Sequence, residues 1–225
     1  MINYDSFFDL VDINTNEIEA AKSYIKLRGL YEHIQMAQFL EPFLHRKPLY
    51  REVATVFRYD KRIRRIIYKY IGFLEEYLRA ALSNNFKEPN DLGIKTSKSL
   101  NEYLPTCLFS VLLQILWRTD KSFKEEIFPV DILLLKNLEA INCLRNAVSH
   151  NRTLVNYRNF FDVTINGKKC NNSLVENIKN LYLHLPKEIG ERFKKEINDA
   201  KFQGNVHRTN QVSWKLPDFL IISIN

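Results

Sequence analysis

Glycine and proline are scarce in this chain of 225 residues, which has six glycines and seven prolines. A sandwich or barrel of many short strands needs frequent turn residues, so this scarcity counts against that class and favours long helices. The three cysteines, Cys107, Cys143 and Cys170, are odd in number and include no C-x-x-C pair. This pattern indicates reduced thiols and argues against both a disulfide framework and a cysteine zinc site.

Targeting and cofactor signals are also missing from the sequence. The N-terminus has no basic stretch followed by an apolar one, and the longest apolar runs (111–117 and 220–224) are far too short to span a bilayer. We therefore expect a cytoplasmic protein with no membrane partner. No glycine-rich phosphate loop, Ser-His-Asp arrangement or carboxylate cluster with metal spacing occurs, so we predict no cofactor and no metal.

Basic residues are in excess. Lys and Arg number 33 against 26 for Asp and Glu, which gives a formal net charge of +7 and favours a polyanionic partner. Four of these cations, Arg62, Arg64, Arg65 and Lys69, cluster at the start of a helix predicted over 61–86, with Asp60 as its N-cap. The cluster has two interpretations, a solvated helix face or a contact with an RNA backbone.

The spacing of apolar residues predicts an all-α fold with at most one small β-hairpin. The hairpin is expected near 160–170, where a β-branched and aromatic run ends in Asn166-Gly167. We predict one domain over 1–225, made of N-terminal helices (1–58), a helical bundle (60–204) and a wrapping tail (205–225) anchored by Trp214 and Phe219. The other helices are predicted at 16–28, 31–44, 48–57, 105–117, 130–150, 173–184 and 186–202.

One of these helices carries the residues that we expect to hold the chemistry. Leu134, Leu138, Ile141 and Val148 recur at steps of four and three, the spacing of one buried helical face. The residue that continues this stripe is Arg145, and a guanidinium on an apolar seam is costly unless an anion meets it.

Beyond Arg145, Asn146 and His150 lie four residues apart and share a helix face. Histidine titrates near neutrality, so an arginine, an amide and an imidazole converge where the helix ends, an arrangement that suits a phosphodiester. The alternative is structural. His150 could simply cap the helix, and Arg145 could pair with an acid such as Glu75 or Glu139.

A second Arg-x-x-x-x-His match spans Arg28 to His33, but Gly29 interrupts it and no apolar stripe leads up to the arginine. We interpret it as structural. Glu75 and Arg79 are expected to form an i, i+4 pair on the long helix.

The motif from Arg145 to His150, followed by Asn151-Arg152-Thr153-Leu154-Val155-Asn156, resembles that of the Abi-like abortive-infection proteins. These proteins, of the AbiD and AbiF type, are bacterial phage-defence proteins of the HEPN superfamily. A second block is also similar to the family's pattern, namely Asp60, the basic helix start and Leu74-Glu75 followed by Leu78-Arg79. The resemblance covers about residues 22 to 200.

The resemblance implies a HEPN-like helical bundle with additional helices and a metal-independent endoribonuclease of the phage-defence or toxin type. It also implies a composite site in which two motifs face each other. Because this chain has one credible motif, we predict a homodimer, with an antitoxin protein or RNA as a possible further partner.

The chemistry of such a site follows from RNA itself, whose 2′-hydroxyl is the nucleophile. One His150 would accept the 2′-hydroxyl proton and its symmetry mate would protonate the leaving 5′-oxygen. Arg145 would hold the phosphate oxygens, and Asn146 would orient the imidazole or the phosphate. Arg152, Tyr157, Arg62 and Arg65 are weaker candidates for RNA contact. The alternative function is a non-catalytic RNA-binding protein that senses or sequesters a structured RNA.

Overall fold

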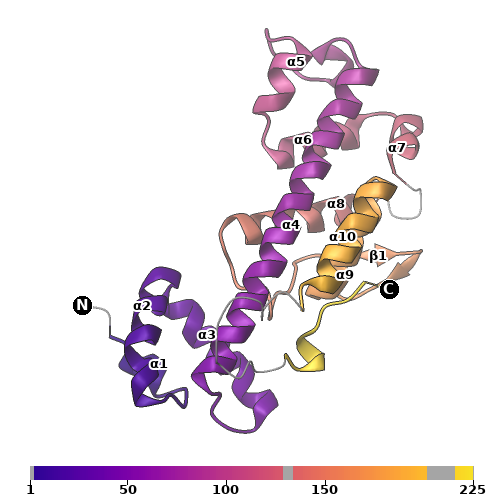
Figure 1. Cartoon of the computed structure of the whole chain (residues 1–225). Helices are drawn as coiled ribbons and strands as arrows, with labels where there is room; N and C mark the ends of the chain where they lie inside the picture. The colour runs from indigo at the N-terminus through magenta and orange to yellow at the C-terminus, as the bar shows by residue number, and fades with distance from the viewer. Residues whose placement is uncertain (1–2, 129–133, 202–215, 225) are drawn as a thin grey trace. The chain divides into compact units, whose positions relative to one another are not determined.

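The structure, a computed structural model, describes residues 3–128, 134–201 and 216–224. These residues are mostly helical and include one two-stranded antiparallel hairpin, which confirms the predicted all-α class (Figure 1). The α-helices are α1 (Asp5–Phe8), α2 (Ile18–Arg28), α3 (Leu30–Leu44), α4 (Tyr50–Asn85), α5 (Leu100–Tyr103), α6 (Phe109–Arg118), α7 (Lys121–Ile127), α8 (Leu135–Ser149), α9 (Leu174–His184) and α10 (Lys187–Asp199). The strands are β1 (Thr164–Ile165) and β2 (Lys168–Lys169), and short 3₁₀ turns are η1 (Thr15–Glu17), η2 (Pro89–Leu92), η3 (Leu104–Thr106) and η5 (Asp218–Leu220).

The backbone divides into two compact units. One comprises residues 1–63 and 199–221, and the other comprises 64–198 and 222–225. Helix α4 is continuous and contributes to both units, since the first boundary falls between Ile63 and Arg64. The single domain predicted from the sequence therefore stays a prediction, and each unit is described by itself.

In the first unit, α3 packs against α1 and α2 around a core that includes Phe7, Ile25 and Met36. Gly29 separates α2 from α3 at φ +99°, a conformation that L side chains rarely adopt. His33 is fully buried, and its ring nitrogen Nδ1 lies 2.6 Å from the carbonyl oxygen of Gly29. The Arg28–His33 match is thus a structural feature, as the interrupting glycine indicates.

Helix α4 corrects the predicted division of this region into two helices, 48–57 and 61–86. Asp60 is not an N-cap but a buried residue in the helix interior. No glycine or proline stands between residues 50 and 61, so the backbone has no reason to stop. The helix begins instead beside Glu52, whose carboxylate accepts the Leu49 N–H at 2.8 Å and pairs with Arg46.

In the second unit, α8 packs against α6 and α9. Its predicted stripe is buried at Leu138, Ile141 and Val148, whereas Leu134 precedes the helix and is 40% exposed. Residues 129–133, where we expected this helix to begin, lie outside the described part of the chain. The helix predicted from Pro105 is corrected too, because Pro105 lies in η3 and α6 begins only at Phe109.

The predicted hairpin forms at Asn166-Gly167, where both residues have positive φ (50° and 72°) as a tight two-residue turn requires. Buried asparagines hold the hairpin segment to the helices. Asn137 on α8 makes two hydrogen bonds with the backbone of Thr164, and Asn159 donates to the Ala140 carbonyl and to Asn177 on α9. These hydrogen bonds satisfy the buried amides and join the hairpin segment to α8 and α9.

The tail is described only in part. Trp214 lies outside the described residues, while the ring of Phe219 stacks on that of Phe43 in the first unit, with centroids 4.6 Å apart. In the second unit, Asn198 on α10 makes two hydrogen bonds with the backbone of Ile224. Within the described ranges, no helix combines the length and apolar character needed to cross a bilayer.

His184 gives the protein a specific dependence of stability on pH. Burial at the end of α9 lowers its pKa to about 4, and its Nδ1 lies 2.8 Å from the Asn180 carbonyl oxygen. Because the pKa is lowered on folding, the stabilisation is complete above about 6.5 and is lost as the pH falls towards 4. Between pH 7 and 5 we expect the free energy of unfolding to drop by about 2 kcal/mol from this residue.

Urea unfolding at pH 7 and pH 5 checks this, with His184→Gln as the comparison. Between pH 7 and pH 5, the free energy of unfolding should fall by about 2 kcal/mol less in the variant than in the wild type. Equal losses in both proteins would contradict a neutral buried His184. Burial also lowers the pKa of His33, which adds a loss of the same sign that both proteins share.

Candidate functional site

The C-terminal end of α8 has a defined geometry that fixes the predicted motif. The N–H of Arg152 donates to the Ala147 carbonyl at 2.9 Å, and that of Asn151 donates to the Val148 carbonyl at 3.2 Å. Asn151 has φ +54°, so the helix ends in a Schellman arrangement with asparagine in the left-handed position. His150 is the C-cap, with φ −89° and ψ 12°. The Asn-Arg pair after the histidine therefore closes the helix.

The three predicted catalytic residues surround this end of the helix. Asn146 and His150 are exposed, and Arg145 is one-third exposed at the border of the buried face. About 40° separates Asn146 from His150 around the axis, and about 100° separates Arg145 from Asn146. The structure thus places an amide and an imidazole together in solvent, with the guanidinium beside them.

Arg145 has an acidic neighbour within the chain. Its Nε lies 3.6 Å from a carboxylate oxygen of Glu75 on α4. The other oxygen of Glu75 accepts from Arg79 at 3.3 Å, and Arg79 also donates to the backbone carbonyls of Leu104 and Cys107. The predicted pair of Glu75 with Arg79 is confirmed, and Glu75 is one of the two acids named as possible partners of Arg145. Glu75 therefore braces the motif helix against α4.

Arg64 makes the second link between α4 and the motif. Its side chain is only 8% exposed, and one of its terminal nitrogens donates to the Asn151 carbonyl at 2.6 Å. A charge-assisted hydrogen bond to the left-handed residue of the cap fixes the backbone directly after His150. The sequence placed Arg64 in a basic cluster that is also part of the resemblance. Its contact with the motif could not be predicted, because the two residues are 87 positions apart in the chain.

The weaker candidates are divided between the units. In the first, Arg62 donates to the Ala200 carbonyl at 2.9 Å, and burial lowers its pKa, so this guanidinium serves the fold. In the second, Arg65 and Arg152 are exposed. Tyr157 is partly exposed, but its hydroxyl is buried without a hydrogen-bond partner among the described residues, and burial raises its pKa.

Metal and thiol chemistry find little support in the described ranges. No group of three or more His, Cys, Asp or Glu side chains there is arranged to hold a metal ion. Cys143 is the cysteine on the motif helix, and burial raises the pKa of its thiol, which disfavours the reactive thiolate. Cys143 is therefore a poor candidate for chemistry at the end of α8.

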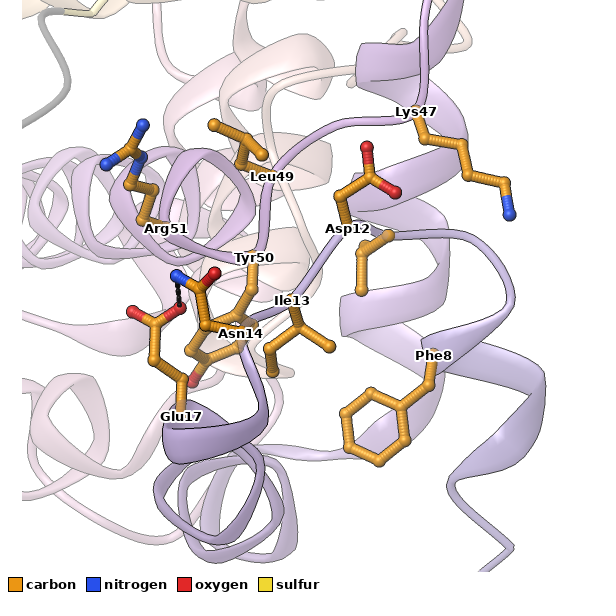
Figure 2. Close-up of a pocket in the computed structure, with 10 residues that line it drawn as sticks. Phe8, Asp12, Ile13, Asn14, Glu17, Lys47, Leu49, Tyr50 and Arg51 are labelled. Atoms are coloured by element: carbon orange, nitrogen blue, oxygen red, sulfur yellow. Dashed lines mark hydrogen bonds between the residues drawn. The ribbon is translucent and has the colours of Figure 1, made fainter.

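The first unit has a cavity of about 530 Å³ that was not predicted from the sequence (Figure 2). Its charged side chains are balanced, two acids (Asp12, Glu17) against two bases (Lys47, Arg51), and Glu17 accepts from Asn14 at 3.0 Å. The balance gives it no preference for an anion. Its other lining residues are Phe8, Val11, Ile13, Leu49 and Tyr50. None of the predicted site residues lines it.

Comparison with protein-family models, with curated proteins and with solved structures gave no match to this chain.

Proposed function

We propose that the chain is a metal-independent endoribonuclease of the phage-defence or toxin type, related to the Abi-like proteins of the HEPN superfamily. The observation that carries the proposal is the turn that ends α8. It holds His150 and Asn146 in solvent with Arg145 beside them, and two links to α4, through Glu75 and Arg64, hold it in place. The net charge of +7 suits an RNA partner.

The reaction needs groups that move protons and a cation that stabilises charge. The 2′-hydroxyl oxygen attacks phosphorus while its proton passes to one imidazole, and the bond to the 5′-oxygen breaks as a second imidazole protonates that oxygen. Arg145 stabilises the charge that builds up on the non-bridging oxygens, and Asn146 orients the imidazole or the phosphate. The products are a 2′,3′-cyclic phosphate and a 5′-hydroxyl.

The second imidazole would come from a second copy of the chain. The described part of the protein offers one His150, and that residue is exposed rather than covered by its own chain. One side of α8 is marked by residues at steps of seven, four and four, namely Leu135, Asn142, Asn146 and His150. A two-fold contact along this side would bring two His150 side chains together. The proposed enzyme is therefore a homodimer. Its proposed location is the cytoplasm.

One observation favours the alternative of a non-catalytic RNA-binding protein. Glu75 already meets Arg145, so the guanidinium has an anion within its own chain and does not require a phosphate. In that case a chain with a net charge of +7 would hold a structured RNA without cutting it. The enzyme proposal, unlike this alternative, also includes an antitoxin protein or RNA as a further partner.

Arg64 supplies a test of how the turn is positioned. Arg64→Met keeps most of the side-chain volume but removes the donor to the Asn151 carbonyl, so the backbone beside His150 is less well fixed. We expect RNA cleavage to fall by up to about 10²-fold, since a small misplacement of reacting groups has this effect. The matched control is Arg118→Met, which removes one exposed arginine from α6 and should leave the rate unchanged.

The cleavage rates should be compared at a temperature where circular dichroism shows both variants folded. A rate for Arg64→Met equal to that of Arg118→Met would contradict a positioning role for Arg64.

The proposal itself is tested by incubating the protein with mixed RNA in EDTA. The enzyme proposal predicts cleavage that rises with the dimer fraction measured by analytical ultracentrifugation. Salt-dependent binding without cleavage by a dimeric protein would favour the binding-protein alternative.

A further inference from the structure

Tyr68 is an exposed aromatic side chain on a helix of the second unit. It lies in the middle of α4, yet 59% of it is exposed. Its ring makes no contact with another aromatic ring in the described part of the chain, whereas the neighbouring Tyr70 is buried and packs against Phe73 and Phe193. Core packing therefore does not explain a tyrosine at position 68.

The helix geometry places Tyr68 on the side of α4 that meets the motif. Arg64 and Glu75 are the α4 side chains that contact Asn151 and Arg145. Taking Arg64 as the reference, Glu75 lies about 20° and Tyr68 about 40° around the axis, so all three share one side. Along the axis, Tyr68 is about 6 Å from Arg64 and about 10 Å from Glu75. Tyr68 thus lies between the two links that hold the motif.

This side of α4 is open beyond Tyr68. The residue one turn further on is Gly72, and a Cβ added there would meet no atom within 4 Å. Glycine in a helix interior is destabilising by roughly 0.5–1 kcal/mol relative to alanine, and packing does not demand it here. The exposed Arg65 precedes Tyr68 by less than one turn. An open surface with an aromatic ring and a cation beside the motif matches the requirements of an unpaired nucleotide.

We propose that Tyr68 stacks on an unpaired base next to the phosphate held at Arg145 and His150, with Arg65 contacting the adjoining phosphate. This inference rests on the proposed function and specifies its substrate as single-stranded RNA. A duplex would be a poor ligand because its bases are already stacked within the helix. Stacking tolerates any base, so the subsite selects for strandedness more than for sequence.

The test measures binding of a fluorescent single-stranded oligoribonucleotide and of the same RNA annealed to its complement. All proteins carry His150→Ala so that the RNA is not cut. Tyr68→Ala should weaken single-strand binding by roughly 5- to 100-fold, the range for loss of one base–aromatic stack. Tyr68→Phe should restore the binding because it keeps the ring. Tyr31→Ala is the matched control, because Tyr31 is another exposed tyrosine on a helix, α3 of the first unit.

An abasic nucleotide moved along the RNA separates stacking from a structural effect. One abasic position should weaken binding to the protein that retains Tyr68, and Tyr68→Ala should show no further loss at that position. The inference would be overturned if the abasic nucleotide and Tyr68→Ala weakened binding additively at every position. It would also be overturned if Tyr68→Ala weakened duplex binding equally or changed the oligomeric state. If the wild type cuts RNA while Tyr68→Ala binds normally, the inference alone fails. If the wild type neither cuts nor binds RNA, the proposed function fails as well.

Discussion

Replacing His150 with alanine is expected to lower the rate of RNA cleavage by about 10³-fold, because a positioned acid or base contributes roughly 10² to 10⁴. In a symmetric dimer the substitution removes both imidazoles at once. The fold should be little affected, since the side chain is exposed and the Schellman hydrogen bonds of Asn151 and Arg152 come from the backbone. Single-turnover cleavage at saturating protein measures the chemical step.

His45 provides a matched control for this substitution. It is another exposed histidine at a helix C-cap, with φ +54°, and it lies in the first unit. His45→Asn keeps a residue that tolerates the left-handed conformation, so it should leave the cleavage rate unchanged. An equal loss in both variants would indicate that His150 matters only as a helix cap or a surface charge.

Replacing Arg145 with alanine is expected to lower cleavage by about 10² to 10³-fold, the effect of removing one group that stabilises a developing charge. Arg145→Lys should recover only part of this loss, because lysine keeps the charge but cannot hold two phosphate oxygens with one planar group. Folding should survive the change, since Glu75 retains Arg79 as a partner. The rate and the affinity for uncut RNA should be measured separately.

Glu75→Gln separates the catalytic role of Arg145 from a structural one. It removes the charge that Arg145 and Arg79 share while leaving both arginines in place. If Arg145 acts on the phosphate, Glu75→Gln should be much less damaging than Arg145→Ala. If the pair serves only to brace α8 against α4, the two substitutions should lower cleavage equally, and the proposed role of Arg145 would be wrong.

Features set by neighbouring residues could be predicted from the sequence. The Asn166-Gly167 hairpin forms because both residues accept positive φ, and the exposed side of α8 follows from the four-residue spacing of Asn146 and His150. The break at Gly29 was predicted for the same reason. The division of α4 into two helices was wrong because Asp60 was taken as a cap, although nothing in its neighbourhood interrupts the backbone.

Features that depend on distant residues were beyond prediction. The side chain of Arg64 on α4 contacts the backbone of Asn151 after α8, and no local sequence pattern relates these two positions. The basic cluster gave no reason to distinguish Arg64 from Arg65. The asparagines that hold the hairpin, such as Asn159, are buried polar residues that carry no periodic signal. Glu75 was named as a partner of Arg145, but only as one of two acids. The resemblance to the Abi-like proteins and the RNA-cleaving activity stay proposals.

Product ends provide the most direct measurement of the central claim, that RNA is cut by its own 2′-hydroxyl at the Arg145–His150 turn. The wild type should cut RNA in EDTA and leave 2′,3′-cyclic phosphate and 5′-hydroxyl ends. A substrate with a 2′-deoxy nucleotide at the cut position should stay intact there. Cleavage that requires a metal ion and leaves 3′-hydroxyl ends, or that proceeds through the deoxy position, would contradict the claim.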